Sequence, residues 1–278
     1  MDADIAPELE SKLVERARTG DSAALEDLIE PLRRPLFSYI YRMVSGRPDA
    51  EDLLQDVLVH VLQSLPTFRR EARFKTWLFG IATHVCLDHL RHKNRWRVEA
   101  QLIGEQEASN DPADMQRLRS IFAQPDFSYD IREHIAFCFS CISRTLPPEE
   151  QAALMLKEVL GFTAQEAAGM LEVSEPVFRH RLQAARLSMT ESYEGLCQLI
   201  NKTGRCWQCK GLREETPESK RGPELVQIEV GPGKAITAEA LFDARIEIVR
   251  NANYAEGHTT AMHDSFLETL QKREENRQ

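Results

Sequence analysis

Aromatic and basic side chains gather between positions 74 and 97, where together they could hold a nucleic acid. The stretch begins with Phe74, Trp77 and Phe79 beside Lys75, and it ends in a basic cluster, Arg91, Lys93, Arg95 and Arg97. Aromatic rings stack on unpaired bases and cations hold phosphates, so this composition suits opened DNA. An ordinary core helix with a solvated basic end fits the same residues, and the stretch alone does not separate the two interpretations.

A compact acidic patch precedes this stretch. Asp52, Gln55 and Asp56 stand at i, i+3 and i+4 in a segment whose apolar residues recur at helical spacing. On a helix these three side chains share one flank, so they could bind a basic protein surface. The alternative is a solvated helix face without a partner.

Six cysteines offer a third kind of chemistry, which is metal binding or thiol oxidation. Four of them form two C-x-x-C pairs, Cys138 with Cys141 and Cys206 with Cys209. Two such pairs can make a tetrahedral zinc site, which here would join distant parts of the chain. The alternative ligands are Cys197, His258 and His263. A redox dithiol and the inert packing of small buried thiols are the two other interpretations.

Composition limits the class of protein. The chain has 278 residues, 42% of them hydrophobic, and a formal net charge of −9, which argues against indiscriminate nucleic-acid binding by the whole chain. Residues 1–63 are net acidic whereas residues 64–100 are net basic, which indicates two partners, one of them anionic. No apolar run is long enough to cross a membrane, and the acidic N-terminus lacks the apolar core of a signal peptide. We therefore expect a cytoplasmic protein.

Helices are expected to position the first two groups of residues. Asp21 can cap a helix over residues 22–29, and a second helix is expected to start at Pro35. Asp49 can cap the helix that carries the acidic patch.

A second helical block is expected from Ile131 onward, after an acidic segment over residues 99–130 that we interpret as a linker with short helical pieces and without a core of its own. A capping box at Thr163 and Glu166 predicts a short helix, and Ser174 can cap a longer, basic one. Helix, tight turn and basic helix form the helix-turn-helix pattern, whose second helix enters the DNA major groove. The alternative is a small helical bundle with a solvated basic helix.

The tail beyond position 192 is expected to contain a strand and two helices. Residues Leu225–Val230 alternate between apolar and polar side chains and predict a strand. Thr237 can cap a helix to about Arg250, and Thr260 can cap one to about Arg273. We expect a small α+β extension, and we interpret it as regulatory, acting through metal binding or thiol oxidation.

In order and separation, the two helical blocks resemble region 2 followed by region 4 of the sigma-70 family, in the form called extracytoplasmic-function (ECF, group IV) sigma factors. The matching residues are Ala50–Val57, Phe74–Leu78, Ile81–Ala82, Leu87–Asp88, Leu90–Arg91, Leu146–Pro147, Gly161–Ala168 and Ser174–Arg186. The resemblance implies a mainly α fold of two helical domains with a small α+β C-terminal extension. The implied divisions are region 2 over 10–98, a linker over 99–130, region 4 over 131–192 and the extension over 193–278.

The resemblance also implies that the chain directs bacterial RNA polymerase to promoters. It assigns Asp52, Gln55 and Asp56 to the clamp helices of the polymerase β′ subunit, and it assigns region 4 to the β flap. The residues expected at the −10 element are Lys75, Thr76, Trp77, His84, Arg91, Lys93 and Arg95. Those expected at the −35 element are Ser174, Glu175, Val177, Arg179, His180, Arg181 and Arg186.

Two departures from the family pattern leave the promoter sequence open. Thr83 and His84 stand where Arg-Asn is frequent, and Val177 and Phe178 replace a more usual Thr-Val pair. A helix-turn-helix regulator that does not join the polymerase would explain the second block but not the acidic patch. A metal- or redox-sensing regulatory protein would explain the cysteines, and a thiol oxidoreductase lacks the βαβ context that its motif needs.

The expected partners are core polymerase, promoter DNA and an anti-sigma factor, with no membrane. No catalytic triad, phosphate-binding loop or pair of catalytic carboxylates is present in the sequence, so we expect a protein that is not an enzyme. No cofactor is required by this interpretation, and zinc at Cys138, Cys141, Cys206 and Cys209 is the candidate metal.

Overall fold

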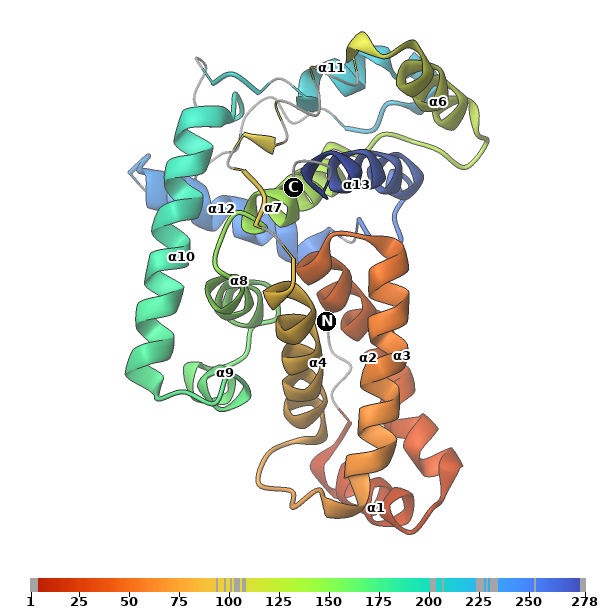
Figure 1. The fold of residues 1–278 in the computed structure, drawn as a ribbon, viewed down its shortest axis with the longest axis vertical. Coiled ribbons are helices and arrows are strands. Elements are labelled where there is room, and N and C mark those ends of the chain that lie inside the picture. Colours follow the sequence, from red (N-terminus) through yellow and green to blue (C-terminus); the bar gives the residue numbers. More distant parts are fainter. Residues whose placement is uncertain are drawn as a thin grey trace.

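The computed structural model describes residues 5–93, 95–97, 99–100, 102, 106, 109–200, 204–206, 208–223, 228, 230, 235–252 and 254–275. These residues are mainly helical, as expected, and the extended backbone among them pairs only in two isolated bridges, Tyr129 with Arg221 and Cys197 with Cys206. The strand expected over Leu225–Val230 falls mostly outside the described residues. Figure 1 shows a first group of helices at the bottom, a second group beside it and further helices across the top.

The first group carries the acidic patch and the aromatic-basic stretch. Its helices are α1 (Pro7–Arg18), α2 (Ser22–Val44), α3 (Arg47–Ser64) and α4 (Phe74–Arg91), with a 3₁₀ turn η1 (Leu65–Thr67) before α4. The Asp21 side chain accepts a hydrogen bond from the Ala24 backbone N–H at 3.1 Å, which confirms the cap of α2. Because α2, α3 and α4 pack against one another, they hold both candidate surfaces on one rigid unit.

Two expected helix ends in this group are wrong. The break before Pro35 is absent, since α2 continues through Pro31 and Pro35. Its apolar side chains remain buried on both sides of the prolines, and this packing outweighs the lost backbone hydrogen bonds. Asp49 does not cap α3, whose N-cap is Gly46; its carboxylate instead lies 3.4 Å from His89 Nε2 of α4.

The second group is the expected helix-turn-helix block. It contains α7 (Ile131–Ser143), α8 (Pro148–Leu154), a π turn η2 (Met155–Val159), α9 (Ala164–Met170) and α10 (Glu175–Leu196). The capping box of Thr163 and Glu166 is confirmed, with both reciprocal hydrogen bonds made. Ser174 occupies the N-cap position of α10, but its side chain makes no capping hydrogen bond.

The remaining helices pack against both groups. They are α6 (Pro112–Ala123), α11 (Gln208–Glu215), the 3₁₀ turn η3 (Glu218–Lys220), α12 (Ala238–Asn251) and α13 (Thr260–Glu275). The helix α6 lies within the segment expected to be a linker, and its Leu118, Ile121 and Phe122 pack in a core that the tail completes. The cap of α12 by Thr237 is confirmed by the 3.1 Å hydrogen bond from Ala240 N–H.

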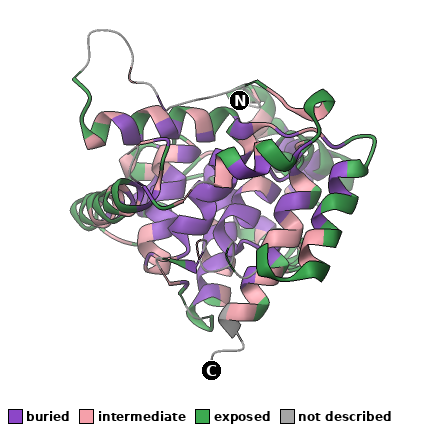
Figure 2. Ribbon diagram, turned by 90° about the horizontal axis from the view of Figure 1, so that it is seen from above, coloured by how far each residue is buried: buried purple, intermediate pink, exposed green. Residues whose placement is uncertain are grey.

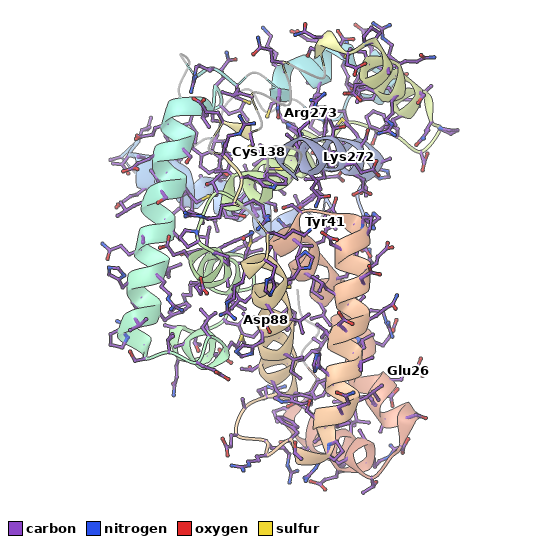
Figure 3. The ribbon with its side chains drawn as sticks, in the orientation of Figure 1. Glu26, Tyr41, Asp88, Cys138, Lys272 and Arg273 are labelled. Atoms are coloured by element: carbon purple, nitrogen blue, oxygen red, sulfur yellow. The ribbon has the colours of Figure 1, made fainter. Side chains whose placement is uncertain are left out.

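Polar contacts anchor the tail to the first group. Arg42 of α2 donates to the carbonyl oxygens of Val249 (3.2 Å) and Ala252 (2.8 Å) at the end of α12. Arg47 and the Tyr41 hydroxyl both donate to Asp264 of α13, and Figure 3 shows Tyr41 at the end of α2 that faces the tail. Figure 2 shows that the buried residues gather at the centre of the molecule, where the groups meet. The tail therefore shares a core with both helical blocks.

Candidate nucleic-acid interface

The acidic patch of α3 faces solvent. Asp52, Gln55 and Asp56 are all exposed, and no ion pair involves either aspartate within the described part of the chain. Next to them, Val59 and Leu62 of the same helix are 49% and 60% exposed, so an apolar pair lies beside the carboxylates. Exposed carboxylates beside exposed apolar side chains form a surface suited to a basic protein partner.

The aromatic entry of α4 is organised by ring stacking. Trp77 is half-buried and stacks on Phe68, with ring centroids 4.6 Å apart and planes inclined by 25°. Phe74 packs edge-on against Phe68 beneath it. The Trp77 ring is thus held in one orientation with part of its surface exposed, as a platform for a base requires.

The next two candidates on α4 are covered by the second helical block. Thr76 is only 8% exposed, and its hydroxyl donates to Glu166 Oε1 of α9 at 3.2 Å. Lys75 places its ammonium 5.7 Å from the centroid of the Phe162 ring. Farther along, His84 Nε2 lies 3.7 Å from Glu172 Oε1, just after α9. This face of α4 can therefore meet DNA only after α9 moves away.

The basic exit of α4 is more accessible. Arg91 is exposed and pairs with Asp88 at 2.7 Å, and Lys93 lies 4.0 Å from Asp49. Arg95 is exposed as well. Trp96, which the sequence interpretation did not single out, is buried beneath the Arg144 guanidinium and fixes this segment against the second block.

The N-terminal half of α10 presents an open surface. Ser174, Val177, Arg179 and His180 are exposed, Glu175 and Arg181 are half-buried, and Phe178 on the opposite side is fully buried. The Arg179 Nε donates to Glu175 Oε1 at 3.1 Å. Val177, Arg179 and His180 thus share the solvent-facing side of the helix, and the half-buried Glu175 and Arg181 flank it. Arg186 is the exception.

Arg186 is directed toward the tail instead of solvent. Its guanidinium donates to Glu158 Oε1 at 2.7 Å and to Asp243 Oδ1 of α12 at 2.6 Å, and it lies 4.9 Å from the centroid of the Phe242 ring. The structure therefore places Arg186 at the junction of α10 with α12. Helical periodicity could not have revealed this, because the acidic partners come from other segments.

The cysteines gather where α7, α10 and the tail meet. Cys138 and Cys141 are buried on α7, and Figure 3 shows Cys138 in the upper part of the molecule. Cys197, Cys206 and Cys209 are half-buried in the tail segment after α10. Within the described residues, however, no three Cys, His, Asp or Glu side chains lie close enough together to hold a metal ion.

Two of the suggested zinc ligands lie elsewhere. His258 is exposed near Asp126, whereas His263 of α13 is fully buried against His134 of α7. The two buried rings are joined by a 3.2 Å hydrogen bond between His134 Nδ1 and His263 Nε2. Burial lowers the pKa of His134 to about 4, and it lowers the pKa of His263 well below its usual value. Both imidazoles are therefore neutral at pH 7.

Acid is expected to weaken the docking of the tail through this histidine pair. The unfolded chain binds protons at both histidines below about pH 6.5, whereas the folded chain resists protonation of His134 down to about pH 4. The free energy of unfolding should fall across this window as pH decreases, by on the order of 3 kcal/mol from His134 alone. Urea melts at pH 7.5, 6 and 4.5 measure the loss.

The control for this prediction is a neutral replacement. Phe137 stacks on His263 with centroids 4.3 Å apart, so His263→Phe preserves the aromatic contact while removing one proton-binding site. The loss on acidification should be smaller in this variant and unchanged in His60→Gln, whose histidine is exposed. An equal acid loss in His263→Phe and the unmodified chain would contradict the assignment.

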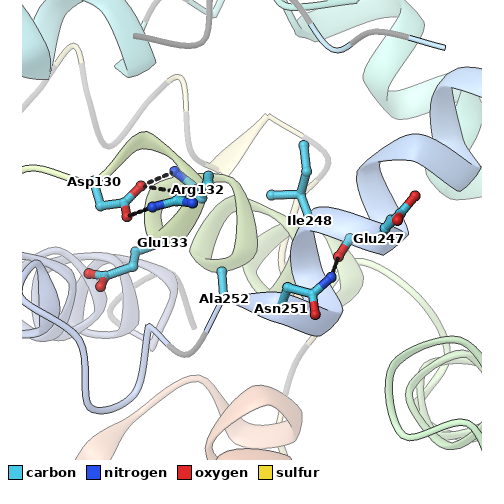
Figure 4. Close-up of a pocket in the computed structure, with 7 residues that line it drawn as sticks. All are labelled: Asp130, Arg132, Glu133, Glu247, Ile248, Asn251 and Ala252. Atoms are coloured by element: carbon cyan, nitrogen blue, oxygen red, sulfur yellow. Dashed lines mark hydrogen bonds and ion pairs between the residues drawn. The ribbon is translucent and has the colours of Figure 1, made fainter. Parts of the chain in front are cut away.

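A cavity of about 320 Å³ lies between the start of α7 and the end of α12 (Figure 4). Its polar lining is already satisfied: Arg132 pairs with Asp130 at 2.8 Å, and Asn251 donates to the Glu247 carbonyl at 2.8 Å. None of the residues expected at a functional site lines it.

Comparison with known proteins identifies both helical blocks. The sigma-70 region 2 model matches residues 28–96, and a sigma-70 region 4 model matches residues 137–189. These two domains, in this order, place the chain in the sigma-70 family, and its relatives are of the ECF type.

Several curated relatives are similar over the two helical blocks. ECF RNA polymerase sigma factor SigG of Mycobacterium tuberculosis is 30% identical over 179 residues, which are 61% of this chain and 48% of SigG. RNA polymerase sigma factor CarQ of Myxococcus xanthus is 29% identical over 189 residues, which are 68% of this chain and 96% of CarQ. The chain thus spans about half the length of SigG. A solved structure, CnrH in complex with the cytosolic domain of CnrY, matches with a TM-score of 0.44 and 19% identity over 66% of this chain and 96% of CnrH.

Proposed function

We propose that this chain binds core RNA polymerase and directs it to specific promoters, as an ECF sigma factor. The main support is that a chain with both sigma-70 domains also has an exposed acidic and apolar surface on α3, whose Asp52 and Asp56 form no ion pair with any described residue. A helix-turn-helix regulator that acts without polymerase has no use for that surface. The role is stoichiometric, so we propose that the chain is not an enzyme.

We assign each proposed partner to an exposed face of the molecule. Asp52, Gln55 and Asp56 dock on the β′ clamp helices, with Val59 and Leu62 supplying apolar contact. The open side of α10 enters the major groove at the −35 element, where phosphate contacts set its position and base-edge contacts set sequence preference. Region 4 also meets the β flap, and an anti-sigma factor is a further partner proposed from family membership. These partners place the protein in the cytoplasm. Among the described helices none is long and apolar enough to cross a membrane.

The −10 face must change before it can act. Thr76 is buried against α9, and Glu166 lies beside Lys75 as an anionic neighbour. We propose that polymerase binding separates the two helical blocks and exposes Lys75, Thr76 and Trp77 to the unpaired −10 strand. Stacking on Trp77 and phosphate contacts from the Arg91–Arg95 exit then hold the opened strand.

No cofactor is needed for this role. A zinc ion shared by Cys138, Cys141, Cys206 and Cys209 stays a proposal for the extension, and it would require these sulfurs to move together, because the described residues form no group of three ligands. Metal analysis of the purified protein tests it directly.

Run-off transcription with purified core polymerase tests the main proposal. Promoter-dependent transcripts should appear only when the chain is added. Promoter binding by the chain alone, without any transcript from the reconstituted enzyme, would favour the regulator instead.

Weakening the contact between α4 and α9 is expected to increase single-strand binding by the free protein. Glu166→Gln removes a negative charge beside Lys75 while keeping a side chain that can accept from Thr163. Affinity for a labelled −10 oligonucleotide should rise about threefold, since one anionic contact is removed. Fluorescence anisotropy measures this, and Glu191→Gln is the matched control, because it removes the same charge from an exposed position on the C-terminal half of α10.

A further inference from the structure

The guanidinium of Arg245, on α12, is buried without a carboxylate partner. The residue is 1% exposed, and within the described residues no aspartate or glutamate forms an ion pair with it. Its Nη2 donates to Cys197 Sγ at 3.0 Å, and its Nε has no hydrogen-bond partner among the residues that the structure describes. The guanidinium carbon lies 3.8 Å from the centroid of the Tyr193 ring. Burying a cation without an ion-pair partner is costly, so the remaining contacts of this guanidinium matter for how α12 is held.

The groups around Arg245 are thiols, a phenol and an imidazole. Besides Cys197, the side chains that interact electrostatically with Arg245 include Tyr193, Cys138 and Cys209, together with His134 of α7. Burial raises the pKa of Tyr193 and of Cys209 well above their usual values, so both stay protonated. Cys197 is the half-buried thiol in direct contact with the guanidinium, and its sulfur accepts the hydrogen bond from Arg245.

The backbone places a second thiol beside Cys197. Cys206 pairs with Cys197 in an isolated parallel bridge, fixed by the 2.8 Å hydrogen bond from Cys206 N–H to the Leu196 carbonyl. Paired residues of this kind lie roughly 5 Å apart, within the range that a disulfide spans. Both cysteines are half-buried, so a small oxidant can reach them.

Gly204 makes this approach of the two segments possible. A Cβ at this position would lie 2.6 Å from the Cys197 carbonyl carbon and 2.8 Å from Gln198 N. Both atoms are backbone, so any side chain here would push the Cys206 segment away. The short distance between the backbones at Cys197 and Cys206 thus depends on a glycine at position 204.

We propose that Cys197 and Cys206 form a reversible disulfide in response to hydroperoxides, and that this oxidation releases α12 from α10. The Cys197 thiolate attacks the O–O bond, which breaks as an S–O bond forms; the leaving oxygen takes a proton and departs as water or an alcohol. Cys206 then attacks the sulfenic acid, the S–S bond forms, and hydroxide leaves with the Cys206 proton as water. Two electrons pass from the two thiols to the peroxide.

Oxidation reaches α10 through the contact of Arg245 with Cys197. Forming the S–S bond turns the Cys197 sulfur toward Cys206, so the buried guanidinium loses its hydrogen-bond acceptor and α12 is held less firmly. The same helix supplies Asp243 and Phe242 to Arg186 of α10. Release of α12 therefore frees a cation on the helix proposed to read the −35 element; this last step rests on the proposed function, whereas the disulfide and the release do not.

Peptide mapping by mass spectrometry tests the disulfide in the full chain. After treatment of the reduced protein with hydrogen peroxide, a Cys197–Cys206 linkage should form, and it should be absent in Cys197→Ser and Cys206→Ser. Gly204→Ala should slow its formation by about tenfold or more, because the thiols are moved apart. Cys86→Ser is the matched control, since Cys86 is fully buried in α4 and away from this cluster. A Cys206–Cys209 linkage in place of the expected one, or stoichiometric zinc that blocks oxidation, would overturn the proposal.

Hydrogen exchange tests the release of α12 without polymerase or DNA, so its failure is separate from any failure of the proposed sigma function. Amides of α12 should exchange about tenfold faster after oxidation, whereas those of α3 should not change. In Arg245→Met, which has no buried charge, oxidation should leave the exchange of α12 unaltered. A disulfide that forms without faster exchange of α12 would refute the coupling.

Discussion

Removing the charges of the α3 patch is expected to abolish most promoter-dependent transcription. In Asp52→Ala/Asp56→Ala the affinity for core polymerase should fall about 30-fold or more, as for truncation of central interface residues worth about 2 kcal/mol. Both side chains are exposed and make no ion pair in the described part of the chain, so stability should be unchanged. Run-off transcription at limiting protein, together with thermal melting, measures both quantities.

A matched variant separates a specific surface from net charge. Glu26→Ala/Asp27→Ala removes the same charge from exposed positions of α2, and Figure 3 shows Glu26 on the outer edge of the first group of helices. Transcription by this control should stay close to that of the unmodified chain. Equal losses in the two double variants would mean that α3 is not the docking surface. Adding excess protein should partly rescue the α3 variant, because the defect lies in binding.

The second large effect is expected at α10. Arg179→Ala/Arg181→Ala removes two cations from its open side, and affinity for −35 duplex DNA should fall between about 10-fold and 100-fold. If both contact phosphates, the slope of log affinity against log salt should decrease by roughly two. Phe178, which directly precedes them, keeps its place in the core, so the helix should remain folded. Anisotropy titrations at several salt concentrations measure both effects.

The control pair for α10 lies on α6. Arg117→Ala/Arg119→Ala removes two exposed arginines at the same spacing, outside both sigma-70 domains. It should leave affinity and salt slope nearly unchanged. If it weakens binding as much as the α10 variant, the attraction comes from general charge and α10 is not the reading helix.

Several features of this chain could be predicted from local sequence because their causes are local. The capping box of Thr163 and Glu166 needs only residues three apart, and the apolar spacing of α4 needs only a helical period. The exposed acidic patch follows in the same way, since residues at i, i+3 and i+4 share a flank and the apolar flank must face the core. The helix boundary predicted at Pro35 was wrong, because the tertiary packing of α2 outweighed the tendency of proline to interrupt a helix.

Sequence by itself thus determined the two sigma-70 domains, their order, and the side of each helix that carries the candidate residues. Only the tertiary structure decided which of these residues are accessible. It buried Thr76 against Glu166, turned Arg186 toward Asp243, and placed Arg245 against Cys197. Each of these contacts joins residues far apart in the chain, and helical periodicity carries no information about which distant segment packs on a face. The physical reason is that the tail completes a core shared with both domains. Which charged side chains of the tail meet which residues of the domains is set by that packing.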